Sequence, residues 1–329
     1  MKVYGLEEHL ATAETMEAWK RRDPLLSEPM MKWALGGETR RRLLDVDEGR
    51  IADMDDAGID TAVLSVTTPG LQNLDGPEAA ALQGPVNDAI AAAVRRHPER
   101  LQGFATLATP APAAAADELR RAVTRLGLNG ALVNARSGDR SLDAPEFWDI
   151  YEAAADLRAP IYLHPRAPVP VVTDAYYGGF DDRVNALLAT GAFGWHYDAG
   201  LTLLRMIVAG VFDRFPDLQV IVGHWGEVVL FYLDRISILD AVTNLQRPIT
   251  EYFRSNIFIT PGGISSHKYL RWSLETVGAD RIMYASDYPY NVERAGSARR
   301  FLDTAPISDA DRERIAFRNW EGLVDGIRR

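Results

Sequence analysis

The chain has 329 residues, of which 47% are hydrophobic and 25% are charged, the balance typical of a globular protein. The formal net charge of −10 argues against a general nucleic-acid binder, which would carry a basic face. There is no cysteine, which excludes disulfides, thiolate nucleophiles and cysteine-bound metals. The length suits a single α/β barrel domain covering residues 1–329.

The N-terminal residues 1–8 lack the apolar run and the cleavage site of a signal peptide. No stretch of the chain approaches the ~20 apolar residues needed to span a bilayer. We therefore expect a cytoplasmic protein whose partners include neither a membrane nor a nucleic acid.

Short apolar runs alternate with helical patterns along the chain. The runs expected to form strands are 3–6, 62–65, 103–106, 130–133, 161–163, 220–223, 257–259 and 282–285. Most are apolar throughout, which is typical of parallel strands buried on both faces. The patterns expected to form helices are 49–57, 86–96, 114–126, 147–157, 199–209, 227–239, 269–277 and 309–319. About eight such alternations predict a (β/α)8 TIM barrel rather than an open sheet.

Local signals mark some of the helix ends. Gly58 is expected to end the helix over 49–57. Asp143 is a candidate N-cap for the helix over 147–157, with Pro145 in its first turn.

Two insertions, after the first and the middle strands, are longer than the other connections of the strand–helix repeat. The first, about 11–45, carries Trp19, Met30, Met31 and Trp33. The second, about 166–199, carries Tyr176, Tyr177, Phe180 and Trp195. Loops this long are usually functional or disordered. Their aromatic content favours ordered lids or subunit contacts.

Four candidate metal ligands lie at the C-terminal ends of predicted strands, which converge at one mouth of a closed barrel. They are Glu7, His9, His164 and Asp287. Glu7 and His9 are two residues apart in an extended strand, so both point to one face, and Glu8 between them points the other way. Each ligand has a structural alternative: a satisfied polar strand end for the first pair, a packed imidazole for His164, and a helix N-cap for Asp287.

Two imidazoles and two carboxylates form a set of ligands for one divalent cation. We expect Zn²⁺ first, with Mn²⁺ or Mg²⁺ as alternatives because of the oxygen ligands. A carbamylated lysine bridging two metals is not expected, since none of the lysines ends a predicted strand; these are Lys2, Lys20, Lys32 and Lys268. No organic cofactor is required.

A second imidazole–carboxylate pair, His224 and Glu227, follows the strand over 220–223. At a spacing of three residues, the Glu227 carboxylate can fix the tautomer of His224 and raise its basicity, and a structural cap is the alternative. Three further residues are candidates for substrate binding. Arg235 can neutralise a substrate carboxylate or belong to a subunit interface, His196 can approach the mouth from the second insertion, and Tyr290 can form an aromatic wall.

These residues belong to a set of motifs along nearly the whole chain. The motifs cover 6–9, 54–60, 64–72, 130–134, 160–165, 210–216, 223–227, 278–282 and 286–289. Through them the chain resembles the amidohydrolase-superfamily decarboxylases that act on ortho-hydroxybenzoates, such as γ-resorcylate and 2,3-dihydroxybenzoate decarboxylases. It departs from that family's usual pattern at Tyr288 and Tyr290, at Thr202-Leu203 where a histidine is common, and at Val228–Leu230 after the Gly-His-Trp-Gly-Glu stretch.

The resemblance implies a (β/α)8 barrel that binds one divalent metal through Glu7, His9, His164 and Asp287, and a homodimer or homotetramer. It also implies reversible, non-oxidative decarboxylation of an aromatic carboxylic acid, in which the metal chelates the carboxylate and the ortho-oxygen. Asp287 is expected to protonate the ipso carbon, assisted by the dyad of His224 and Glu227. The alternative is a metal-dependent hydrolase of a lactone, amide or C–C bond that uses a metal-activated water. A non-catalytic barrel would lack some of these ligands, and all are present.

Overall fold

The computed structural model describes residues 1–21, 28–29, 31–292 and 294–329. Met30 and the side chain of Trp33, both singled out above, lie outside the described part of the chain. The main strands pair in parallel in two groups, in the orders β1-β2-β3 and β10-β9-β8-β5-β4. Their bounds are Tyr4–Leu10 (β1), Thr61–Val66 (β2), Leu101–Gly103 (β3), Ala105–Thr106 (β4), Ala131–Asn134 (β5), Ile161–His164 (β8), Val220–Val222 (β9) and Ile257–Ile259 (β10).

Backbone hydrogen bonds join the two groups into a closed ring. The break between β3 and β4 is a single residue, Phe104, whose N–H donates to the Leu64 carbonyl at 2.8 Å. At the other side, Met283 N donates to Ile259 O at 2.9 Å, and Leu6 N donates to Tyr284 O at 3.1 Å. The predicted strand over 282–285 therefore takes the closing position, although only isolated bridges form there. The predicted (β/α)8 barrel is confirmed.

The barrel interior is filled by side chains from every strand position of the ring. They are Tyr4, Leu6, Val63, Phe104, Leu132, Tyr162, Ile221, Phe258, Met283 and Ala285. Trp320 joins them from α19 (Asn319–Asp325), and its indole N–H donates to Gln102 Oε1 at 2.8 Å. Because the interior is solid, any site must lie at an end of the barrel.

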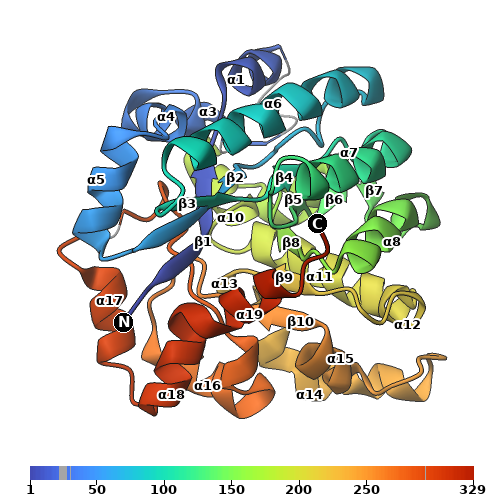
Figure 1. Cartoon of the computed structure of the whole chain (residues 1–329). Helices are drawn as coiled ribbons and strands as arrows, with labels where there is room; N and C mark the ends of the chain where they lie inside the picture. The colour runs from blue at the N-terminus through green and yellow to red at the C-terminus, as the bar shows by residue number, and fades with distance from the viewer. Residues whose placement is uncertain (22–27, 30, 293) are drawn as a thin grey trace.

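Helices surround the ring, as Figure 1 shows, and a larger apolar core fills the space between them and the strands. They include α5 (Glu48–Ala57), α6 (Gly76–Arg96), α7 (Pro112–Thr124), α8 (Trp148–Leu157), α11 (Gly194–Val208), α12 (Val211–Arg214), α15 (Ile249–Ser255), α16 (His267–Val277), α17 (Ser297–Asp303) and α18 (Asp309–Glu313). Gly58 ends α5 with a left-handed φ of 82°, as predicted. No helix in the described ranges is both long and apolar enough to cross a membrane.

Two helix predictions and one cap prediction differ most from the structure. The helix expected over 227–239 is broken into α13 (His224–Glu227), α14 (Leu233–Ile236) and 3-10 turns, because the chain turns left-handed after His224. The helix expected over 86–96 begins earlier, at Gly76, where Asp75 caps it by accepting from Glu78 N at 2.9 Å. Asp143 caps no helix; its carboxylate accepts from Arg205 at 2.8 Å, and α8 follows a 3-10 turn over Pro145–Phe147.

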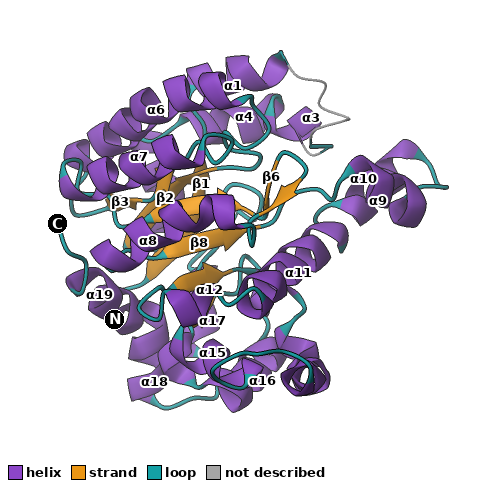
Figure 2. Cartoon of the chain, turned by 90° about the vertical axis from the view of Figure 1, so that its right-hand side faces the viewer, coloured by secondary structure: helices purple, strands orange, loops and turns teal. Residues whose placement is uncertain are grey.

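The two insertions contain short helices. The first forms α1 (Ala13–Lys20), α3 (Met31–Ala34) and α4 (Gly37–Leu44), and Trp19 is buried there with its indole bonded to Gly70 O at 2.7 Å. The second contains α9 (Pro170–Val172) and α10 (Asp182–Ala189). A short antiparallel pair, β6 (Arg136–Ser137) and β7 (Arg140–Ser141), lies outside it and follows β5. Figure 2 shows α9 and α10 projecting away from the barrel.

Candidate active site

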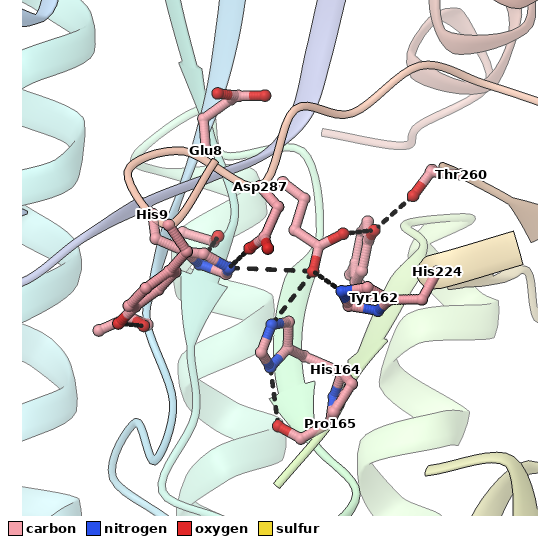
Figure 3. A network of polar contacts seen from close by, with 12 residues as sticks. Glu8, His9, Tyr162, His164, Pro165, His224, Thr260 and Asp287 are labelled. Atoms are coloured by element: carbon pink, nitrogen blue, oxygen red, sulfur yellow. Dashed lines mark hydrogen bonds and ion pairs between the residues drawn. The ribbon is translucent and has the colours of Figure 1, made fainter. Parts of the chain in front are cut away.

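The structure brings the four predicted ligands together at the C-terminal mouth of the barrel. Glu7 and His9 come from β1, His164 ends β8, and Asp287 follows the closing segment. One ligand atom of each lies within 4.8 Å of those of the others. Glu7 Oε1 is 3.1 Å from His164 Nε2, and His9 Nε2 is 3.4 Å from Asp287 Oδ1. Figure 3 shows His9, His164 and Asp287 pointing toward one another.

The imidazoles are held so that their Nε2 atoms face this cluster. His164 Nδ1 lies 2.8 Å from the Pro165 carbonyl, which can only accept, so Nδ1 carries the proton and Nε2 offers its lone pair. His9 Nδ1 is paired with Ser65 Oγ at 3.2 Å. The buried atoms Glu7 Oε1 and His9 Nε2 make no hydrogen bond with any described residue. Two unsatisfied buried polar atoms aimed at one point fit a bound cation.

Glu7 is anchored by its other oxygen. The Tyr162 hydroxyl donates to Glu7 Oε2 at 2.5 Å and lies 2.8 Å from Thr260 Oγ1. Burial alone would raise the pKa of Glu7, but the imidazoles of His224, His164 and His9 outweigh it and lower that pKa below its ordinary value. Burial and the adjacent carboxylate raise the pKa of Tyr162. Glu7 is therefore an ionised carboxylate with a fixed orientation, as a metal ligand requires.

Glu8 points away from the ligand cluster, as its position in the strand predicts (Figure 3). It is buried, and its carboxylate accepts from Ser286 N at 3.0 Å and from Ser286 Oγ at 2.7 Å. Burial raises the pKa of Glu8 to about 7. These bonds hold β1 against the residue that precedes Asp287.

His224 and Glu227 lie beside the cluster as a hydrogen-bonded pair. His224 Nδ1 is 2.8 Å from Glu227 Oε1, and His224 Nε2 is 4.0 Å from Glu7 Oε1. Burial lowers the pKa of His224, but the carboxylates of Glu227 and Glu7 outweigh it and raise that pKa to about 10. Burial likewise raises the pKa of Glu227, whereas the imidazoles of His224 and His196 bring it below its ordinary value. The pair therefore consists of the His224 imidazole and an ionised Glu227 carboxylate.

The pair depends on a strained turn. Residues His224, Trp225 and Glu227 have φ values of 47°, 58° and 51°, in the left-handed region that non-glycine residues avoid. Gly262 makes room for this turn, since a Cβ on it would lie 2.7 Å from His224 N. Strain of this kind concentrates at functional sites.

The three predicted substrate-binding residues lie in different places. Tyr290 is beside the cluster, with its ring 5.9 Å from that of His9 and its hydroxyl 2.7 Å from Thr67 Oγ1. His196 lies at the dyad, 2.8 Å from Glu227 Oε2. Arg235 is exposed on α14, and it is not one of the described residues that line the cavity beside His224. Tyr288 packs away from the mouth, with its hydroxyl on Asp53 at 2.7 Å.

A cavity of about 820 Å³ opens next to the dyad, a size that accommodates a small ligand. Its polar lining residues include His196, His224 and Ser273. The rest of its lining is mainly apolar and comes from α11, the segment after Glu227 and α16; it includes Phe193, Tyr197, Leu201, Leu204, Trp225, Val228, Val229, Leu230, Phe231, Tyr232, Ile236, Ile264, Tyr269 and Trp272.

Sequence reasoning missed the residues that hold the ligands. Asn134 Oδ1 lies 3.2 Å from His164 Nδ1, and Ser65 supports His9. Both are polar residues at the ends of apolar runs, the same signal that identified the ligands. Tyr162 could have been found from strand periodicity, because it shares a face with His164 two residues on.

The protein is a parallel barrel with two imidazoles and two carboxylates clustered at its C-terminal mouth. This combination defines the structural class of the metal-dependent hydrolases that are built on a barrel. Residues 31–319 match the family model described as amidohydrolase, and the chain belongs to this family. It is 35% identical over 332 residues to γ-resorcylate decarboxylase of Polaromonas sp. (strain JS666 / ATCC BAA-500), covering 97% of each chain. The resemblance noted above is therefore confirmed.

Two solved structures are similar over almost their whole length. One is 5-carboxyvanillate decarboxylase from Novosphingobium aromaticivorans DSM 12444, complexed with manganese and 4-hydroxy-3-methoxy-5-nitrobenzoic acid, with a TM-score of 0.89, 32% identity and coverage of 98% of this chain and 96% of that one. The other is dihydroxybenzoic acid decarboxylase from Polaromonas sp. JS666, with bound manganese and the inhibitor 2-nitroresorcinol, with a TM-score of 0.85, 31% identity and coverage of 98% and 97%.

Proposed function

We propose that this protein is a metal-dependent decarboxylase that converts an ortho-hydroxybenzoate-type acid to the phenol and CO2. The observation that carries the proposal is the cluster of Glu7, His9, His164 and Asp287 beside the His224–Glu227 pair, in a chain whose similar relatives are named decarboxylases. A divalent ion held by the four side chains would supply positive charge for the carboxylate and ortho-oxygen of the substrate.

The chain's own groups provide the rest of the reaction. The bond to the carboxyl carbon breaks, its electron pair stays on the ring, and the ipso carbon takes a proton. Asp287 is the proposed proton donor, since it is part of the cluster yet its side chain keeps 14% of its surface accessible, and Asn291 Nδ2 steadies its outer oxygen at 3.1 Å. His224, oriented by Glu227, stabilises the carboxylate that leaves as CO2. Tyr290 forms a wall for the aromatic ring.

For the metal we propose Mn²⁺. The support is the oxygen share of the ligand set and the manganese named in both solved relatives. The expectation of Zn²⁺ is not confirmed by these relatives.

We also propose a homodimer or homotetramer. The support is an exposed apolar surface along α11 and the segment after Glu227, which includes Phe193, Tyr197, Leu201, Val228, Phe231, Tyr232, Ile238 and Val242. Phe231 and Tyr232 are 58% and 60% exposed, and patches of this kind mark association surfaces. Arg235 is exposed among these residues, which supports a place at the subunit interface over contact with a substrate in its own barrel.

The test is ultraviolet turnover of salicylate, 2,3- and 2,6-dihydroxybenzoate and 5-carboxyvanillate by metal-free protein and by protein loaded with Mn²⁺ or Zn²⁺. Chelator-sensitive loss of one acid with its phenol appearing, and solvent deuterium on the ring carbon that carried the carboxyl group, is the expected result. Protein with stoichiometric metal that leaves the whole panel unchanged would contradict the proposal. Sedimentation of the same sample tests the oligomer.

A further inference from the structure

Glu227 lies between two histidines rather than one. Its Oε1 is 2.8 Å from Nδ1 of His224, and its Oε2 is 2.8 Å from Nδ1 of His196. The carboxylate is fully buried, and the rings of the two histidines are 4.5 Å apart. A buried carboxylate is stabilised when both oxygens accept hydrogen bonds, so His196 completes a site that His224 leaves half satisfied.

Acceptors hold both ring nitrogens of His196. Nδ1 lies 2.8 Å from Glu227 Oε2, and because a carboxylate oxygen accepts, the imidazole N–H donates in this contact. Nε2 lies 3.1 Å from the Gly191 carbonyl. Together the two contacts fix the orientation of the His196 ring.

The close packing of α11 makes this contact possible. His196 is in the first turn of α11, and Gly200 follows it by four residues on the same face. A Cβ on Gly200 would lie 2.2 Å from Glu227 O, so only glycine lets the helix approach this closely. The position of His196 against Glu227 therefore depends on a small residue one turn away.

We propose that His196 is a positioning residue of the catalytic dyad: it fixes Glu227 through the second carboxylate oxygen, and Glu227 in turn holds His224 with Nε2 facing the metal ligands. The role of the dyad in turnover rests on the proposed function. The hydrogen-bonded chain from His196 through Glu227 to His224 rests on the geometry alone.

A double-mutant cycle tests whether His196 acts through Glu227. His196→Leu should lower kcat by about 10–100-fold with little change in KM, the usual effect of removing an orienting partner. In a Glu227→Gln background the same change should cost less than about 2-fold, because coupled residues are not additive. His196→Gln, which keeps a donor toward Glu227, should recover part of the loss. Equal losses in both backgrounds would mean a general packing role and would overturn the proposal.

Two controls separate this effect from local unfolding. His267, another half-buried histidine that donates to a carbonyl (Phe301 O, 2.9 Å), should tolerate leucine without loss of kcat. Gly200→Ala should reproduce His196→Leu, since the added methyl group moves α11 away from Glu227. Normal kcat in Gly200→Ala, with the His196 contact shown broken in its crystal structure, would also overturn the proposal.

A measurement without turnover keeps this test independent of the proposed function. In metal-free protein carrying ¹⁵N-histidine, Nδ1 of His196 should carry a hydrogen-bonded proton, and the Nδ1 proton of His224 should exchange faster in His196→Leu than in the parent. A His196 ring without a proton on Nδ1 would refute the assignment. Metal analysis provides a further check: two ions per chain, one of them lost in His196→Leu, would make His196 a ligand rather than a positioning residue.

Discussion

Replacing Tyr162 by phenylalanine should weaken metal binding while leaving the barrel intact. The change removes the hydroxyl that donates to Glu7 Oε2 at 2.5 Å and leaves a ring of almost the same shape in the barrel interior. That ring keeps its edge contact with Phe104, with the centroids 5.9 Å apart. Glu7 Oε2 then remains buried and charged with its main donor gone.

The expected size follows from the kind of bond that is lost. A hydrogen bond to a charged group contributes about 1.5–3 kcal/mol. Loss of a partner that orients a metal ligand typically lowers metal affinity by about 10–100-fold. A tenfold change corresponds to about 1.4 kcal/mol, so the two estimates agree at roughly 1.5–3 kcal/mol.

The assay is competition for Mn²⁺ between the protein and a chelator of known affinity. Tyr151→Phe is the matched control, because Tyr151 is also buried and its hydroxyl donates to Leu142 O at 2.8 Å, away from the ligand cluster. The control should lose about 0.5–1.5 kcal/mol of unfolding free energy and keep the parent Kd for metal. Parent Kd values in both variants would refute the view that Tyr162 orients Glu7.

The remaining predictions concern the reaction, the metal and the surface. Asp287→Asn should retain some metal, measured by elemental analysis, and lose nearly all turnover; normal kcat would remove Asp287 as the proton donor. Removing the metal should lower the unfolding free energy by about 2.7 kcal/mol relative to protein at a free metal concentration of 100 times Kd. An unchanged Tm would argue that the cluster binds no ion. Burial raises the pKa of Asp143, but hydrogen bonds from Arg205 and Ser141 outweigh it, so the pKa in the folded protein is lowered. The ionised carboxylate therefore stabilises the fold at pH values above its pKa in the unfolded chain. This stabilisation is lost as the pH falls through the pKa in the folded protein. Asp143→Asn should therefore cost up to about 1 kcal/mol in urea unfolding at pH 7 and nothing in strong acid, and a gap that persists in acid would contradict the pairing.

The fold and the ligand cluster could be predicted because both follow from local patterns. Apolar runs give the strands, and a polar residue directly after such a run lies at the mouth of a parallel barrel. Glu7 and His9 share a face by strand periodicity alone. The spacing of three between His224 and Glu227 was also a sufficient signal for their contact.

What could not be predicted depends on backbone turns and on contacts between distant segments. The helix expected over 227–239 is interrupted because His224, Trp225 and Glu227 adopt left-handed φ values, which no residue preference indicates. The position of Arg235 follows from that interruption, since a continuous helix would have carried it elsewhere. Asp143 had a suitable spacing for a cap, but Arg205, 62 residues away, provides a stronger partner.

The bond between Glu8 and Ser286 joins residues that are 278 positions apart. It links the neighbour of two ligands at the start of the chain to the neighbour of the last ligand near its end. During synthesis, Glu7 and His9 therefore emerge from the ribosome long before Asp287 is added to the chain. The cluster of four side chains cannot assemble until then. Binding of the proposed metal by all four side chains is therefore a late event, which is possible only after synthesis is almost complete and the ring has closed.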